Sequence, residues 1–172
     1  MAQITVANTD WEILAAVKTA LANAAIGSYA VFAAAYVTSG PATFLQVQTQ
    51  ESPVAVVEYL TTTEDVGVRD SDAAHERNCV LSAQIRIAVM VEGDDELDEC
   101  DRVQEALRLK NAAINAVEAA APSDATFLAD GEMFAEGIQW GEPEIDLESN
   151  KPWAVVSLPV EFGYRLTAPT AH

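Results

Sequence analysis

Basic residues are scarce in this sequence. Nine Lys and Arg stand against 27 Asp and Glu, which gives the 172-residue chain a formal net charge of -18 at pH 7. Proteins that hold DNA or RNA tightly neutralise its phosphates with Lys and Arg, so this composition argues against nucleic acid as a bound partner. A large negative charge instead favours solubility and repels other polyanions.

Long uninterrupted hydrophobic runs are also missing. Residues 19–50 carry no charge but are interrupted by residues such as Gly27 and Pro41, whereas a membrane-spanning helix needs about 20 consecutive apolar residues. The first nine residues lack the positive charge that opens a signal peptide, and Asp10 and Glu12 follow them. We therefore expect no membrane span and no cleaved leader, and a product that stays in the cytoplasm where it is made.

Residue types that carry out catalysis or hold metals are few. The two cysteines, Cys79 and Cys100, form no CxxC pair, and the two histidines are His75 and His172. This distribution favours reduced thiols over a disulfide or a zinc site. The sequence has no P-loop, G-x-G-x-x-G or G-x-S-x-G motif, so neither a phosphate-binding loop nor a nucleophile elbow is predicted.

Two acidic segments deserve testing as cation sites. Glu92–Asp101 lacks the D-x-D-x-D-G loop of an EF-hand, and its carboxylates better suit the positive end of a helix dipole, where each contributes about 0.3–1 kcal/mol. Asp70, Asp72 and His75 have no second histidine nearby and are typical of a solvated loop. We predict no metal, no cofactor and no catalytic residue.

Helical and strand spacing predicts the first half of the fold. A capping-box pattern at Thr9 and Glu12 opens a helix over about 10–24, and residues 29–38 are expected to be extended or irregular. Pro53–Leu60 and Leu81–Val91 have the composition and alternation of strands. The polar segment between them, about 61–78, is predicted to be a protruding loop.

A second helix is predicted after Gly93, and it ends before Pro122. Its predicted buried stripe is Leu97, Cys100, Val103, Leu107, Ile114 and Val117. Residues 123–136 are predicted to form a loop.

Two alternating runs close the chain. The first has a carboxylate at every second position, namely Glu142, Glu144, Asp146 and Glu148. Side chains of a strand alternate between its faces, so these four are predicted to share one face. In the second run, residues 153–166, one face is predicted to be buried (Ala154, Val156, Leu158, Val160, Phe162, Tyr164 and Leu166) and the other exposed, including Val155 and Glu161. The two runs are expected to pair as a hairpin.

The carboxylate pair Glu142 and Glu144 also raises the question of hydrolysis. Side chains two apart on one strand face lie roughly 7 Å from each other, which matches the wider separation of glycosidase carboxylates. Apart from Trp140 and Trp153, no aromatic residues flank the pair to form a pocket. A solvent-exposed strand face is the favoured interpretation.

Helices placed between pairs of strands predict an α+β fold. We expect a single domain over residues 1–172, a mostly antiparallel sheet packed by two helices in the order helix-strand-strand-helix-strand-strand, and a short polar tail at 167–172.

This order of elements resembles the tail terminator, or tail completion, proteins of long-tailed bacteriophages and related tail-like particles. The segments that carry the resemblance are the proline-led strand Ser52–Tyr59, the long strand Ala83–Val89, the acid-led helix and the final strand Trp153–Phe162. Residues 29–50 depart from the pattern. The resemblance covers most of the chain as an order of elements and includes no signature motif.

The resemblance implies a structural virion protein and no enzyme. Such proteins form a ring, usually of six subunits, at the head-proximal end of the tail tube, where they end tube polymerisation and offer a surface to the head-tail connector protein. The expected partners are therefore other copies of the chain, the tail tube protein and the connector, with DNA only in transit. An acidic channel would repel that DNA.

Two groups of residues are the candidates for these contacts. The candidate lumen or acidic surface comprises Glu142, Glu144, Asp146 and Glu148. The candidate inter-subunit or partner loop contains Glu64, Asp65, Arg69, Asp70, Asp72, His75, Glu76 and Arg77, and the 123–136 segment is a second candidate loop. Two alternatives stay open: another head-tail neck, stopper or tail tube protein, and an acidic α+β small-molecule-binding domain or hydrolase.

Overall fold

Residues with high helix propensity dominate two segments of the chain. Thr9–Ala22 forms α1 and Glu96–Ala120 forms α3, and both are rich in Ala and Leu. The computed structural model describes residues 9–38, 52–65, 76–90, 96–120, 131–147 and 153–167. In this part of the chain neither helix combines the length and the apolar character needed to cross a membrane.

The described strands form a small sheet and a large one. The strands are β1 (Ala25–Ile26), β2 (Tyr29–Ala30), β3 (Ala34–Thr38), β4 (Val54–Asp65), β5 (Glu76–Met90), β6 (Gly131–Trp140), β7 (Glu144–Asp146) and β8 (Trp153–Thr167). β1 and β2 pair with each other, and the large sheet has the order β3-β4-β5-β8-β6, with β7 also paired to β8. The predicted α+β class, a sheet packed by two helices, is confirmed in this general form.

The large sheet is built around β5. Ile85 on β5 lies opposite Val57 on β4 and Leu158 on β8, both in antiparallel register. β6 and β7 are also antiparallel to β8, whereas β3 runs parallel to β4. The sheet is therefore mostly antiparallel, as predicted, with a parallel pair at one edge that the sequence pattern did not indicate.

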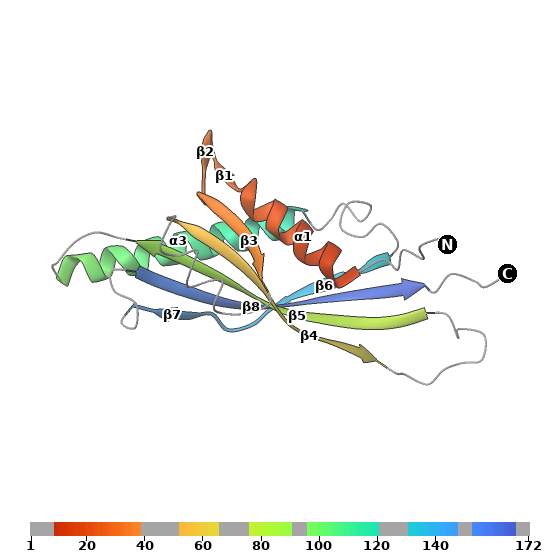
Figure 1. Ribbon diagram of the computed structural model, residues 1–172. Helices are drawn as coiled ribbons and strands as arrows, with labels where there is room; N and C mark the ends of the chain where they lie inside the picture. The colour runs from red at the N-terminus through yellow and green to blue at the C-terminus, as the bar shows by residue number, and fades with distance from the viewer. Residues whose placement is uncertain are drawn as a thin grey trace.

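Both helices pack on the same face of the large sheet, so the core lies between one helical layer and one sheet layer (Figure 1). Ile13 and Leu14 of α1 and Leu109 of α3 are fully buried against Ile85 and Phe162 of the sheet. Removal of such side chains from water is the main stabilising contribution, about 25 cal/mol per Å² of apolar surface.

The burial of β8 matches most of the predicted alternation. Every second residue from Ala154 to Tyr164 is buried in the main core, and the side chain of Leu166 lies outside the described ones. The prediction for Val155 is wrong, because it is buried on the opposite face in a smaller apolar cluster with Val54, Val56 and Ala88. The register places Val54 and Val155 on either side of Ala88, so three adjacent strands bring these apolar residues together.

Strands form in residues 29–38, which were predicted to be extended or irregular, and in residues 131–136, which were predicted to lie in a loop. The extended alternative is therefore confirmed for the first segment, and the loop prediction is wrong for the second. Within residues 29–38 the chain forms β2 and then β3, which pairs with β4. Residues 131–136 belong to β6, which pairs with β8 from Gly131 opposite Leu166, with an irregularity between Met133 and Ile138. The long edge of β8 supplies backbone partners that a local pattern does not reveal.

The buried stripe of α3 differs from the predicted one. The inward-facing residues are Arg102, Ala106, Leu109, Ala113 and Val117, whereas Leu107 is 40% exposed. Val103 and Ile114 are half-buried. The side chains of Leu97 and Cys100 lie outside the described ones. Of the predicted stripe, Val117 is confirmed and Leu107 is wrong.

Candidate functional site

The predicted acid strip is shorter than its sequence pattern. β7 contains only Glu144–Asp146, and Glu142 is exposed in the connection that precedes it. Pro143 has no backbone N–H to give to a strand ladder, so pairing with β8 starts only at Glu144. The prediction that Glu142 continues the strand is therefore wrong, and Glu148 lies outside the described residues.

The pairing of β7 with β8 shows where the carboxylates of the strip lie. Glu144 is opposite Ser157 and Asp146 is opposite Val155. Residues directly opposite each other in an antiparallel pair share a face, and this face is the one opposite α1 and α3, which we call the outer sheet face. Ile145 has the other orientation and packs against the main core.

Glu161 adds a third carboxylate to the outer sheet face. It is exposed on β8, at the alternating position predicted to be exposed, and it lies opposite Gln139 of β6 and Ser82 of β5. The Ser82 hydroxyl donates a 3.5 Å hydrogen bond to Glu161 Oε1. The outer sheet face therefore carries Glu144, Asp146 and Glu161.

An ion pair also lies on the outer sheet face. Glu58 of β4 is only 6% exposed, and its Oε2 lies 3.0 Å from Nε of Arg86 on β5. Arg86 Nε also donates a 3.1 Å hydrogen bond to Gln84 Oε1. A buried carboxylate requires such a partner, and Arg86 balances the charge of Glu58. The carboxylates of Glu144 and Glu161 are exposed, so their charge reaches the solvent.

The candidate partner loop is also shorter than predicted. β4 continues to Asp65 and β5 begins at Glu76, so Glu64, Asp65, Glu76 and Arg77 belong to strands. Three consecutive β-branched threonines, residues 61–63, favour this extension of β4. The rest of the candidate loop, namely Arg69, Asp70, Asp72 and His75, lies outside the described residues.

Sequence patterns did not reveal the polar cluster around Asp10. Tyr164 Oη donates a 2.5 Å hydrogen bond to Asp10 Oδ1, and Thr62 Oγ1 donates a 2.9 Å hydrogen bond to Asp10 Oδ2. Burial, followed by the hydrogen bond to Asp10, raises the pKa of the Tyr164 phenol well above its ordinary value. The position of Asp10 in the first turn of α1 predicts a dipole contact only, because Thr62 and Tyr164 are distant in sequence.

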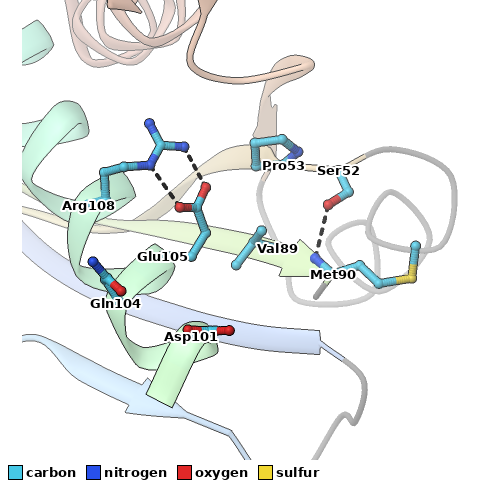
Figure 2. Close-up of a pocket in the computed structure, with 8 residues that line it drawn as sticks. All are labelled: Ser52, Pro53, Val89, Met90, Asp101, Gln104, Glu105 and Arg108. Carbon is cyan, nitrogen blue, oxygen red and sulfur yellow. Dashed lines mark hydrogen bonds and ion pairs between the residues drawn. The ribbon is translucent and has the colours of Figure 1, made fainter. Parts of the chain in front are cut away.

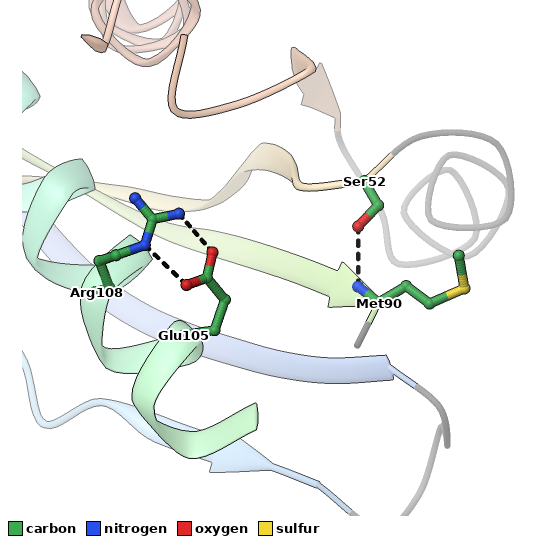
Figure 3. Close-up of polar contacts among 4 residues, drawn as sticks. All are labelled: Ser52, Met90, Glu105 and Arg108. Atoms are coloured by element: carbon green, nitrogen blue, oxygen red, sulfur yellow. Dashed lines mark hydrogen bonds and ion pairs between the residues drawn. The ribbon is translucent and has the colours of Figure 1, made fainter. Parts of the chain in front are cut away.

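A cleft of about 620 Å³ opens between α3 and the adjoining ends of β4 and β5 (Figure 2). The residues that line it are Ser52, Pro53, Val89, Met90, Asp101, Gln104, Glu105 and Arg108. The backbone N–H of Met90 donates a 2.9 Å hydrogen bond to Ser52 Oγ (Figure 3). This bond fixes the start of β4 beside the end of β5.

Two charged residues of this cleft, Glu105 and Arg108, are paired with each other. Arg108 Nε donates a 2.8 Å hydrogen bond to Glu105 Oε2, and Arg108 Nη2 contacts Glu105 Oε1 (Figure 3). The hydrogen bond from Arg108 lowers the pKa of the Glu105 carboxyl, and the same bond raises the pKa of Arg108. This bidentate pair stabilises the surface of α3 and leaves Asp101 as the other charged residue lining the cleft.

The described residues contain no cluster suited to metal binding. Among those residues no three His, Cys, Asp or Glu side chains lie close enough together to hold an ion. Cys79 is buried on β5 as a reduced thiol. His75 and His172 lie outside the described residues.

Comparison with known proteins gives distant structural likeness but no match in sequence. No protein-family model and no curated protein sequence matches the chain. One similar solved structure is a chain described as "Virion of native gene transfer agent (GTA) particle", with 13% sequence identity and a TM-score of 0.44 over 96% of this chain and 99% of that one. At this distance we infer no function from the likeness.

Proposed function

We propose that this chain is a structural protein of a phage-like particle, and specifically a tail terminator. Six copies form a ring at the head-proximal end of the tail tube, end tube polymerisation and join the tail to the head-tail connector protein. The protein resides in the tail or neck of the virion and is assembled in the host cytoplasm. DNA passes through the ring without being held.

The acidic outer sheet face is the observation that carries this proposal. Glu144 and Glu161 are exposed there, and Asp146 lies on the same face. The helices cover the opposite face and form the core with it. In our proposal the outer face lines the channel, where carboxylates repel the phosphates of passing DNA. A net charge of -18 per copy has the same sign.

The layout of the chain gives further support. The large sheet has both helices on one side, which agrees with the expected sheet packed by two helices. The long strands β4, β5 and β8 extend as an arm beyond the helix-covered core (Figure 1). Every second residue of β8 from Ala154 to Tyr164 is buried in the main core, so the arm consists of its C-terminal end and the neighbouring ends of β4 and β5. Such an arm can reach a neighbouring subunit or the tube.

Electron microscopy of the purified protein tests the proposal directly. A tail terminator gives single rings, whereas a tube protein stacks into long tubes, and a monomeric ligand-binding domain gives neither. A high-resolution ring structure then shows which face lines the channel. A neutral or basic channel, or a channel lined by the helices, would contradict the proposed role of the outer sheet face.

Deleting the gene provides a test in the particle. Without a terminator the tail tubes continue to grow, so we expect tubes longer than normal that carry no heads. Supplying the wild-type protein should restore normal length. Heads joined to tails of normal length in the deletion strain would contradict the proposed function.

A further inference from the structure

The β1–β2 hairpin stands away from the large sheet (Figure 1). Ala25 lies opposite Ala30 and Ile26 opposite Tyr29, and Gly27 and Ser28 form the turn. Gly27 has a φ of +64°, and no other residue of the turn has a positive φ. A positive φ at the first central residue only is typical of the type II′ turn that joins tightly paired strands.

The hairpin is fixed to the protein at its base and not at its tip. Ala24, Val31 and Phe32 are buried in the main core, and the Val31 N–H donates a 2.8 Å hydrogen bond to the Ala24 carbonyl. Every residue from Ala25 to Ala30 is exposed. A two-stranded hairpin is only marginally stable by itself in water, so additional contacts at the tip would stabilise it.

Large apolar side chains lie at the exposed tip. Tyr29 is 79% exposed and Ile26 is 54% exposed, and they face the solvent as a cross-strand pair. Tyrosine is one of the residues that most often anchor protein interfaces, because it buries a large area at a small cost in entropy. The tip therefore has the chemistry of an interface anchor.

A groove of about 380 Å³ lies between the base of the hairpin and α3. Ala25 and Ile26 line one side, and Arg108, Asn111 and Asn115 line the other. None of the described residues that line it is acidic. Apolar walls suit an aromatic ring, and the two side-chain amides can exchange a hydrogen bond with a phenol hydroxyl.

We propose that the hairpin of one copy docks in the hairpin–α3 groove of a neighbouring copy, with Tyr29 as the anchor. Copies of a chain with a net charge of -18 repel each other, and like charges placed together at an interface cost several kcal/mol. The hairpin lies within residues 19–50, which contain no charged residue. Hairpin and groove therefore meet without facing carboxylates, which favours a second copy as the occupant.

The anchor Tyr29 is not among the described residues that line the groove, so docking joins two different surfaces of the same chain, as in a heterologous contact. Contacts of this type close into rings when the rotation between copies allows it. The inference rests on the proposed function only in requiring that the copies assemble head to tail. It does not require that the ring sits on a tail tube.

Replacing both tip residues tests the contact. We expect the double variant Ile26→Ser/Tyr29→Ser to weaken self-association by about 10- to 30-fold, the effect of losing an interface anchor. Sedimentation equilibrium over a range of concentrations measures this change. Leu60→Ser is the matched control, because Leu60 is 49% exposed on β4, belongs to the large sheet and not to the β1–β2 sheet, and is not among the described residues that line the groove. Because both altered side chains are exposed, the circular dichroism spectrum should remain that of the wild type.

Cross-linking locates the two sides of the contact. In the double variant Ser28→Cys/Asn115→Cys, which keeps the Tyr29 anchor and places a thiol beside it in the exposed turn, oxidation should give a ladder of covalent multimers on a denaturing gel, while either single variant should not. An unlinked or internally linked monomer in that variant would overturn the inference. So would a wild-type protein that stays monomeric at all concentrations, or a hairpin that cross-links to the tube protein and not to its own copies.

The outcomes separate this inference from the proposed function. Rings that assemble with wild-type affinity in Ile26→Ser/Tyr29→Ser would overturn the hairpin contact and leave the tail terminator proposal standing. Cross-linked multimers from a protein that forms no closed ring would support the hairpin contact and contradict the terminator proposal.

Discussion

Tyr164 Oη lies 2.5 Å from Asp10 Oδ1, a hydrogen bond that joins β8 to the first turn of α1 across 154 positions of sequence. The second carboxylate oxygen of Asp10 accepts a hydrogen bond from Thr62 of β4. One carboxylate thus fixes α1 to two long strands, near the end where the sheet extends beyond the helices. The position of that arm relative to the helical layer depends on this cluster.

Replacing Tyr164 by Phe should lower the free energy of unfolding by about 1.5–3 kcal/mol. The ring and its packing remain, but a hydrogen bond to a charged group is lost. Urea denaturation measures the change. Tyr59→Phe is the control, because the Tyr59 hydroxyl lies 3.3 Å from Thr62 Oγ1 in an exposed position, and we expect a change within about 0.5 kcal/mol. Equal losses in the two variants would show that Asp10 is not the important acceptor.

Alkaline titration should separate Tyr164 from the other tyrosines. The chain has four tyrosines, and burial together with Asp10 raises the pKa of Tyr164 well above its ordinary value. We expect the phenolate absorbance of the folded protein to stop short of four ionised groups and to reach four only on unfolding. In Tyr164→Phe the late step should be missing.

The free energy of unfolding should also depend on pH, because the pKa of Tyr164 is higher in the folded protein than in the unfolded chain. Below pH 10 the phenol is neutral in both states, so its contribution to stability is complete. Above pH 10 the unfolded chain loses the proton while the folded protein keeps it, so stability falls as the pH rises toward the raised pKa of the folded state. Tyr164→Phe should show a smaller fall in stability over that range than the wild type.

The strands of the core could be predicted because burial imposes a period of two. Ile85, Ile87 and Leu158 alternate with polar or small residues, and the register places Ile85 opposite Leu158 on the buried face. A slip of one residue would move all of them to the wrong face. Local pattern and tertiary structure therefore agree in β5 and in most of β8.

β6 was not predicted because its partner is remote in sequence. Residues 131–136 have no clear alternation, and their pairing with the far end of β8 determines their conformation.

The prediction of a strand over the whole acid strip, Glu142 to Glu148, failed for the opposite reason. Its alternation is clear, but Pro143 and the tight connection at Gly141, whose N–H donates to the Pro159 carbonyl, prevent the strand from starting before Glu144.

The side of α3 that faces the core could not be predicted by selecting the most hydrophobic residues. Ala106 and Ala113 are fully buried, while the larger Leu107 is exposed. Small side chains on the inner side of a helix allow close approach to the sheet and to α1, and a pattern based on large apolar residues overlooks them. The predicted stripe was therefore displaced around the helix.

Leu109→Ala and Leu107→Ala test this orientation of α3. Leu109 is fully buried, so its truncation should cost about 2–5 kcal/mol of unfolding free energy through lost burial and a cavity. Leu107 is 40% exposed, so the same change there should cost much less, within about 1 kcal/mol. Chemical denaturation compares the two variants. Similar costs at both positions would contradict the observed orientation of α3.

Charge reversal on the outer sheet face tests whether its carboxylates repel DNA. We expect rings of Glu144→Lys/Glu161→Lys to bind a short DNA duplex at least about 10-fold more tightly than the wild type at low salt, because lysines lining a channel would neutralise phosphates. The control Glu12→Lys/Asp101→Lys makes the same change in net charge on the helical layer and should bind less tightly than the sheet-face variant. Fluorescence anisotropy at several salt concentrations measures both affinities, and the tighter binding should weaken steeply as salt rises. Equal binding by the two variants would mean that net charge alone repels DNA and that the outer sheet face does not line its path.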